Sequence, residues 1–181
     1  YRSIQNYNDN TLNVCIPATY RFFDAVVDAL SALHREAGQP LQTFHIGADE
    51  TAGAWTESPA CADQLAKANG DGSALGAGFI ERIAADLAAR GIATAGWSDG
   101  LGHTDPARMP GTTQTNIWGP LHRRAITEAH EQINRGWNVV LSIPDLGYFD
   151  MPYAPHPDEG GYTWATRGVD THQVYAFMPD N

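Results

Sequence analysis

The chain has 181 residues, of which 43% are hydrophobic and 18% charged, a composition typical of a globular protein with one sizeable core. Its formal net charge is −10 and no basic cluster occurs, so a polyanion would be repelled and nucleic acid is not an expected partner. No run of about 20 apolar residues is present, so no membrane-spanning segment is expected.

Helical and strand-like patterns alternate along the first half of the chain. Apolar residues at three- and four-residue steps predict a helix over residues 19–38, with Thr19 as its N-cap and Gly38 as its stop. A short strand-like run follows at 41–47. A second helix is predicted near residues 77–90, ended by a glycine, and a strand follows it at 92–97.

The second half continues with a strand at 115–118, a helix near 124–135 that ends at Gly136 and a strongly apolar strand at 138–143. The region from Pro144 onward is rich in proline, glycine and aromatic residues and is predicted to be a long loop. This alternation is typical of a parallel sheet covered by helices, either an open doubly wound sheet or a barrel. Four strands are too few to close an eight-stranded barrel, so in the barrel case the chain is part of a domain.

Acidic and aromatic residues follow each predicted strand at its carboxyl end. The loops at the carboxyl ends of parallel strands converge on one crevice, so a functional site is predicted there. The residues concerned are Asp49 and Glu50 after the first strand, Trp97 and Asp99 at the second, Trp118 at the third, and Asp145, Tyr148 and Asp150 after the fourth.

The adjacent acids Asp49 and Glu50 are the candidate catalytic centre. Two neighbouring carboxylates beside apolar residues repel each other and lose hydration, which favours keeping a proton on one of them. A protonated carboxylic acid can donate to a leaving glycosidic oxygen. Two alternatives are an acid pair at a helix N-terminus and a metal site that adds His45 and Asp99. Because no paired histidine spacing supports the metal site, no metal or other cofactor is expected.

Trp97, Trp118 and Trp164 form a second group of candidates. Tryptophan is most often packing in a core, but indole faces also stack on the apolar faces of sugar rings. Trp97 and Trp118 end predicted strands, and Trp164 lies in a loop rich in glycine and tyrosine. These three are therefore predicted to bind a sugar, whereas Trp137, at the opposite end of the last strand, is predicted to be structural.

Two cysteines, Cys15 and Cys61, are too few for a zinc site of their own. They are either two buried thiols or one disulfide that closes a loop around the acidic pair. A disulfide would indicate an oxidising compartment such as a periplasm. The chain begins with Tyr1 and shows no charged-then-apolar leader, so a targeting signal is expected to lie outside this sequence.

Several ordered motifs resemble glycoside hydrolase family 20, the β-N-acetylhexosaminidases. The run His45-Ile46-Gly47-Ala48-Asp49-Glu50 resembles the family's His-x-Gly-x-Asp-Glu motif, and the following residues 51–55 resemble its bacterial chitobiase branch. The resemblance covers essentially the whole chain. Its other motifs lie at residues 95–100, 116–119, 144–153, 160–164 and 177–181.

This resemblance implies a partial (β/α)₈ TIM barrel, about strands four to seven with their helices. Residues 1–181 would then be part of one catalytic domain that lacks the first strands and the last strand, and the rest of the same barrel would be their partner. The resemblance also favours a Cys15–Cys61 disulfide. It implies an exported protein, in the periplasm or associated with the outer membrane through an N-terminal signal outside this sequence.

The implied activity is hydrolysis of terminal β-linked GlcNAc from a GlcNAc-terminated oligosaccharide such as chitobiose. The family's roles would make Glu50 the general acid and base, Asp49 the residue that orients the acetamido group, and Tyr148 a hydrogen-bond donor to the acetamido oxygen. Trp97, Trp118 and Trp164 would form the apolar walls of the sugar site.

Two other functions remain open from the residues alone. A conventional glycosidase would pair Glu50 with a second carboxylate, either Asp99 or Asp145. A non-catalytic carbohydrate-binding module would explain the tryptophans and the acidity, but not an acid pair at the end of a strand. The residues do not distinguish GlcNAc from GalNAc.

Overall fold

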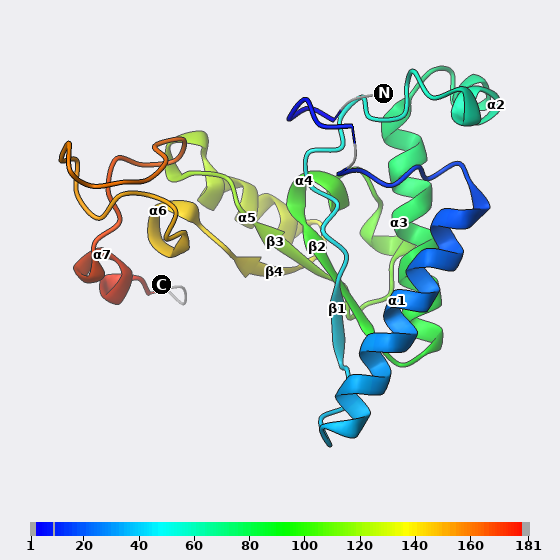
Figure 1. The fold of residues 1–181 in the computed structure, drawn as a ribbon, viewed down its shortest axis with the longest axis horizontal. Coiled ribbons are helices and arrows are strands. Elements are labelled where there is room, and N and C mark those ends of the chain that lie inside the picture. Colours follow the sequence, from blue (N-terminus) through cyan, green and yellow to red (C-terminus); the bar gives the residue numbers. More distant parts are fainter. Residues whose placement is uncertain (1–2, 9, 179–181) are drawn as a thin grey trace. The chain divides into compact units, whose positions relative to one another are not determined.

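The computed structural model describes residues 3–8 and 10–178, so the end of the predicted motif at 177–181 lies outside the described residues. The chain divides into two compact units, Tyr1–Gln114 and Thr115–Asn181, which are described separately. The predicted helices and strands occur in the predicted order, and short helices at Ala62–Lys67 and Ser98–Leu101 are present in addition (Figure 1).

The first unit is built on a parallel strand pair. Its β1 and β2 pair in a register that places Thr43 opposite Ala93 and His45 opposite Ala95. Both strands therefore release their loops at the same edge. The elements are α1 (Pro17–Glu36), β1 (Thr43–His45), η1 (Pro59–Cys61), α2 (Ala62–Lys67), α3 (Gly72–Ala89), β2 (Ala93–Trp97), α4 (Ser98–Leu101) and η2 (Pro106–Arg108).

Helices α1 and α3 lie side by side and share one apolar cluster (Figure 1). Phe23 and Val27 of α1 pack with Ile83 and Leu87 of α3, and all four are buried. Removing these side chains from water stabilises the unit and holds both helices beside the strand pair. This core fixes the positions from which the loops after β1 and β2 begin.

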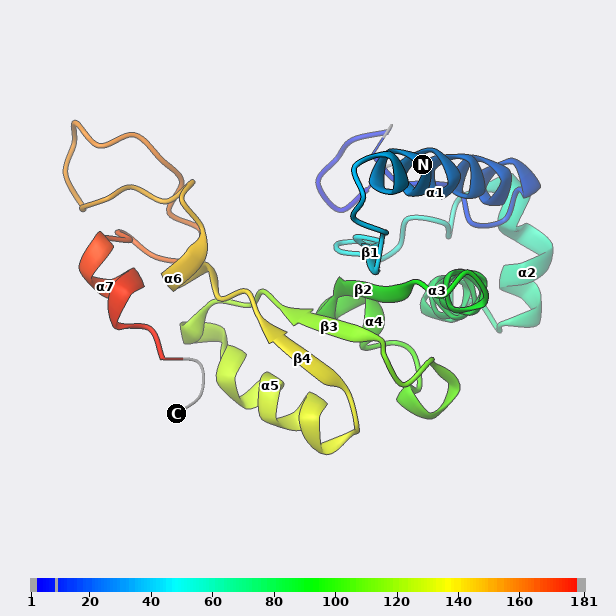
Figure 2. The same ribbon diagram turned by 90° about the horizontal axis from the view of Figure 1, so that it is seen from below.

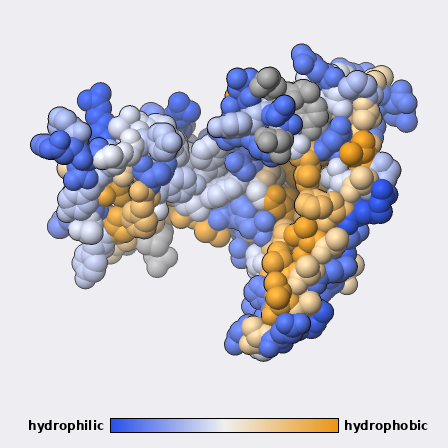
Figure 3. All heavy atoms as spheres, in the orientation of Figure 1, coloured by the Kyte–Doolittle hydropathy of each residue, from blue (hydrophilic) through white to orange (hydrophobic). Residues whose placement is uncertain are grey.

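Part of the apolar surface of α1 remains exposed. Phe22 and Leu33 are 57% and 60% accessible, and Leu30 is also exposed. Figure 3 shows this apolar stripe along the visible face of α1. The predicted apolar set of this helix is therefore buried only in part.

A disulfide joins Cys15 and Cys61, which confirms that prediction. Cys61 is fully buried in a second cluster with Trp55 and Leu65. The indole N–H of Trp55 donates to the Leu12 carbonyl at 2.9 Å, so the chain before α1 is attached to the segment that follows the acidic pair.

The helix ends were predicted better than the helix starts. Gly38, Gly91 and Gly136 follow helices with positive φ angles of 69°, 73° and 99°, as expected of helix-terminating glycines. Thr19 is not an N-cap, because α1 begins at Pro17, whose fixed φ suits the first turn, and the Thr19 hydroxyl instead donates to the Asn13 carbonyl.

Helix α3 also begins earlier than predicted, at Gly72. The Asp71 side chain accepts the Ser73 N–H at 2.8 Å and so supplies the N-cap. The prediction missed this start because residues 72–76 include two glycines and show little apolar periodicity.

The second unit contains β3 (Gln114–Ile117), which begins at the unit boundary, and its neighbour β4 (Asn138–Leu141). Ser142 N–H donates to the Ile117 carbonyl at 2.8 Å, just beyond the two strands. Figure 2 shows α5 (Ala125–Asn134) alongside β4. Ala125 and Ala129 of this helix pack against Ile117 and Ile143. Trp137 is buried, which agrees with its predicted structural role.

The region after Pro144 is not entirely loop, so that prediction was wrong in part. It contains α6 (Pro144–Gly147) and α7 (Thr171–Ala176). A further short helix of this unit, η3 (Leu121–Arg123), precedes α5. Helix α7 has a full capping box, in which Asp170 and Gln173 each bond the other's backbone N–H. Within the described residues, no helix is long and apolar enough to cross a bilayer.

Candidate active site

The loop that leaves β1 carries the acidic pair in an unusual backbone conformation. Gly47, Ala48 and Glu50 have φ angles of 71°, 74° and 50°. A left-handed conformation is uncommon for residues other than glycine and persists only where surrounding contacts enforce it. In this loop Asp49 is exposed and Glu50 is half-buried.

The segment that leaves β2 supplies those contacts. Trp97 N–H donates to the Gly47 carbonyl at 2.8 Å, which extends the strand pairing into the loop. The Asp99 carboxylate accepts the backbone N–H of Glu50 at 2.7 Å. Gly100 lies against Ala48 so closely that a β-carbon on Gly100 would sit 2.0 Å from the Ala48 carbonyl oxygen. The acidic loop is thus held by Trp97 at the end of β2 and by Asp99 and Gly100 of α4.

His45 supports the same loop from within. Its Nδ1 accepts the Gly47 N–H at 3.1 Å, and its ring meets the Trp97 indole edge-on with the centroids 5.0 Å apart. Burial lowers the pKa of His45 below its usual 6.5, while the negative charge of Asp49 opposes that shift. An Nδ1 that accepts a hydrogen bond belongs to a neutral imidazole, so the geometry and the pKa agree.

Gln5 is a contact of the acidic pair that sequence reasoning did not identify. Its side-chain amide donates to the carboxylate of Glu50. The two residues are 45 positions apart, and no motif in the sequence links them. Gln5 therefore joins the residues around the candidate general acid.

A cavity of about 300 Å³ borders the acidic loop within the first unit. The stretch from Ile46 to Asp49 lines it, and apolar side chains that include Trp55, Phe79 and Ile80 line it as well. The Asp49 region is therefore next to an apolar space on this side of the loop.

The second unit brings together three of the predicted site residues. The Trp164 ring lies 6.0 Å from the Trp118 ring and 5.7 Å from the Tyr148 ring, both in edge contacts. The Trp164 indole N–H donates to the Asp150 carboxylate at 3.0 Å. Trp97, the remaining predicted tryptophan, belongs to the first unit and contacts His45.

Asp99 and Asp145, the acids that a conventional glycosidase would pair with Glu50, each accept a backbone N–H. Asp99 accepts the Glu50 N–H, and the Asp145 carboxylate accepts the Leu121 N–H at 2.9 Å. Among the described residues, no group of three or more His, Cys, Asp and Glu side chains is placed to hold a metal ion.

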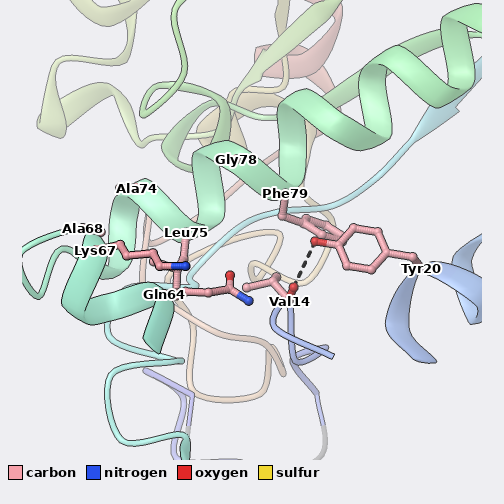
Figure 4. A pocket seen from close by; sticks show the side chains of 9 residues that line it. All are labelled: Val14, Tyr20, Gln64, Lys67, Ala68, Ala74, Leu75, Gly78 and Phe79. Atoms are coloured by element: carbon pink, nitrogen blue, oxygen red, sulfur yellow. Dashed lines mark hydrogen bonds between the residues drawn. The ribbon is translucent and has the colours of Figure 1, made fainter. Parts of the chain in front are cut away.

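A further hollow of about 410 Å³ lies between α2, α3 and the start of α1 (Figure 4). Leu75 and Phe79 line it, together with the polar ends of Gln64 and Lys67. Tyr20 borders it and donates its hydroxyl to the Val14 carbonyl at 2.9 Å. None of the predicted site residues lines this hollow.

The whole chain resembles proteins that are already known. Residues 1–181 match the sequence model of glycosyl hydrolase family 20, catalytic domain. The chain is 51% identical over 181 residues to "Beta-hexosaminidase B" of Pseudoalteromonas piscicida, covering 100% of the chain and 23% of that relative. It is 32% identical over 213 residues to "N,N'-diacetylchitobiase" of Vibrio harveyi, covering 99% of the chain and 24% of that relative.

A solved structure shows the same fold. The GH20 exo-β-N-acetylglucosaminidase of Vibrio harveyi in complex with N-acetylglucosamine superposes with a TM-score of 0.77 and 31% identity, over 99% of this chain and 26% of that one. This agreement, together with the family match, confirms the predicted partial (β/α)₈ barrel. The chain spans about a quarter of the length of these relatives. That residues 1–181 form part of one catalytic domain stays a prediction.

Proposed function

The chain belongs to glycosyl hydrolase family 20, and from this membership we propose that the intact protein is a β-N-acetylhexosaminidase of the chitobiase type. Its substrates are oligosaccharides that carry a terminal, non-reducing, β-linked GlcNAc. The names of the relatives support this choice, as does the N-acetylglucosamine bound to the similar Vibrio harveyi enzyme. The rest of the same catalytic barrel is the proposed structural partner of residues 1–181.

The observation that carries the proposal is the placement of Asp49 and Glu50. They lie in the loop that leaves β1, at the edge where β2 also ends, and contacts from the β2 side hold this loop in one conformation. A preorganised acid pair at the carboxyl edge of a parallel sheet is an arrangement suited to catalysis. A binding module would not require it.

Adjacency of the two acids determines the reaction type that we propose. Adjacent residues on one chain are poorly placed to act from opposite faces of a sugar, as the usual pair of glycosidase carboxylates does, and family 20 enzymes are a known exception to that scheme. The 2-acetamido oxygen of the substrate therefore attacks the anomeric carbon. The bond from the anomeric carbon to the leaving oxygen breaks as that oxygen takes a proton from Glu50, which gives an oxazolinium intermediate. Water then opens this intermediate, and the hydrolysed sugar has retained stereochemistry.

The remaining groups have separate roles in this proposal. Asp49 orients the acetamido N–H and stabilises the positive charge of the intermediate. Tyr148 donates to the acetamido oxygen as it attacks. Glu50 then acts as a base for the incoming water. Trp97, Trp118 and Trp164 form apolar surfaces for the sugar and its acetamido methyl group.

The disulfide supports a location for the protein. A Cys15–Cys61 bond persists in an oxidising compartment, so we propose that the protein is exported to the periplasm or beyond. Cell fractionation tests this, and recovery of the protein with reduced cysteines in the cytoplasm would contradict it.

The central experiment compares Glu50→Gln with the unaltered intact protein. The kcat for substrates with poor leaving groups should fall by about 10²–10⁴-fold, the usual scale of general acid–base catalysis. Asp49→Asn should also be severe, and a thiazoline mimic of the intermediate should inhibit strongly. Glu57→Gln, an exposed acid in the same unit, is the matched control and should leave kcat unchanged.

Two results would refute the proposal. Unchanged hydrolysis by Glu50→Gln would show that Glu50 is not the general acid and would favour a binding role for this chain. Equal turnover of a glycoside without the 2-acetamido group would remove substrate assistance and favour a conventional pair of carboxylates.

A further inference from the structure

The backbone of the acidic loop has to be held in place by contacts from elsewhere. Ala48 and Glu50 both adopt left-handed φ angles, of 74° and 50°. For side chains larger than glycine this conformation is disfavoured, because the Cβ approaches the backbone carbonyl too closely. Without external contacts the loop would relax and the acidic side chains would point elsewhere.

The Asp99 carboxylate makes the contact that is most specific to the acids. Its Oδ2 accepts the Glu50 N–H at 2.7 Å, the short distance typical of a hydrogen bond to an ionised acceptor. This N–H belongs to the peptide that links Asp49 to Glu50. Fixing that peptide plane therefore fixes the direction in which each of the two side chains leaves the backbone.

The neighbouring residue Gly100 restricts the position of the acidic loop by direct contact. It approaches the Ala48 carbonyl so closely that no side chain could be placed there, which leaves the loop little room to shift toward α4. Asp99 and Gly100 are consecutive residues of the short helix that follows β2. The loop is thus limited by contact on one side and held by a hydrogen bond next to it.

We propose that Asp99 is a positioning residue, which sets the orientation of the Asp49–Glu50 pair through the Glu50 backbone and does not itself act on the substrate. This inference rests on the proposed function of Glu50 as general acid. It differs from the two-carboxylate alternative, in which Asp99 would act through its own charge near the sugar. The acceptor function, and not the negative charge, is then what the reaction requires.

Two substitutions separate these roles in the intact protein. Asp99→Ala removes the acceptor, whereas Asp99→Asn removes the charge but keeps an amide oxygen that can accept the same N–H. Asp99 is exposed, so both variants should fold. Asp99→Ser is a further variant, which keeps an acceptor oxygen on a shorter side chain. Asp105→Ala is the matched control, since Asp105 also accepts a backbone N–H, that of Ala107 at 2.9 Å, away from the acidic loop.

The measurement is kcat with an alkyl GlcNAc glycoside and with its 4-nitrophenyl counterpart. Misplacement of the general acid by about 1 Å can cost about 10²-fold, and a good leaving group needs less help. Asp99→Ala should therefore lose about 10²-fold on the alkyl glycoside and about tenfold or less on the nitrophenyl one. Asp99→Asn should stay within about fivefold on both, and Asp105→Ala should match the unaltered protein.

Amide hydrogen exchange at Glu50 gives a second readout that does not depend on activity. The Glu50 N–H should exchange at least about tenfold faster in Asp99→Ala than in the unaltered protein or Asp99→Asn. Equal impairment of Asp99→Asn and Asp99→Ala would overturn the positioning role in favour of a catalytic charge. Unchanged exchange in Asp99→Ala would also overturn it. If Glu50→Gln were fully active, the proposed function would fail, while the exchange result would still decide whether Asp99 holds the loop.

Discussion

Gly100 and Ala48 approach each other so closely that the position of a β-carbon on Gly100 lies 2.0 Å from the Ala48 carbonyl oxygen. Real β-carbons are not found at such a distance from backbone atoms, so the contact requires glycine. The two residues belong to the segments after β2 and β1, which leave the strand pair at the same edge. The close approach lets the acidic loop lie directly against α4.

Gly100→Ala should displace the acidic loop. Overpacking of this kind against backbone costs about 1–3 kcal/mol, and the kcat of the intact protein should fall by about 10²-fold as Glu50 moves. Ala48→Gly should not rescue the variant, because the Ala48 carbonyl remains. The free energy of unfolding and kcat measure both effects.

Gly78→Ala is the matched control for this substitution. Gly78 lies within α3, and a β-carbon there would meet nothing within 4 Å. Alanine should therefore stabilise the helix by about 0.5–1 kcal/mol and leave kcat unchanged. Equal behaviour of the two glycine variants would contradict the argument for Gly100.

The disulfide should contribute strongly to stability. It joins residues 46 positions apart and so restricts a long loop of the unfolded chain, an effect of about 4 kcal/mol in the chain-entropy model. Replacing both Cys15 and Cys61 by alanine should lower the free energy of unfolding by about 2–4 kcal/mol in urea titrations. The unaltered protein under reducing conditions should behave like the double variant, and equal stability of all three samples would contradict the prediction.

His45 should make stability depend on pH. Its pKa in the folded protein is lowered by burial from the usual 6.5, so the unfolded chain binds more protons between these two values. The stability contribution is therefore complete above pH 6.5 and is lost as the pH falls toward the lowered pKa. Protonation of Nδ1 would also break its hydrogen bond from the Gly47 N–H.

His45→Asn tests this dependence, because the asparagine oxygen can accept from Gly47 but does not titrate. The thermal midpoint should fall between about pH 7.5 and about pH 5.5 by more in the unaltered protein than in His45→Asn. Parallel changes in the two proteins would assign the pH dependence to other groups.

Trp164 and Asp150 should be energetically coupled. The indole N–H donates to the carboxylate at 3.0 Å, but Trp164 is 39% accessible, so the coupling should be modest, about 0.5–1 kcal/mol. A double-mutant cycle of Trp164→Phe and Asp150→Leu measures it through the free energies of unfolding. Strictly additive effects would show that the hydrogen bond adds no stability.

Local sequence patterns predicted the features that depend on neighbouring residues. Helix stops at Gly38, Gly91 and Gly136 follow from the freedom of glycine to adopt positive φ, a property of each residue alone. The order of strands and helices followed from apolar spacing. The family was recognisable from ordered motifs, and the acidic pair was located from its place after an apolar strand.

The starts of some helices were not predicted, because they depend on single residues at the helix end and not on apolar periodicity. Pro17 and Asp71 begin α1 and α3 earlier than the apolar pattern does. Helix α7 is held by the Asp170–Gln173 capping box within a region rich in proline and glycine. In none of the three cases does a buried face determine where the helix begins: α1 begins with a proline, and α3 and α7 begin at a side-chain cap.

The sequence by itself determined that Asp49 and Glu50 form an acid pair at the end of a strand. Only the tertiary structure decided how that pair is held. The Asp99–Glu50 hydrogen bond links residues 49 positions apart, and the left-handed angles of Ala48 and Glu50 have no counterpart in any local pattern. Such contacts arise because β1 and β2 pair in one register and bring their two loops together, which no periodicity within either segment specifies.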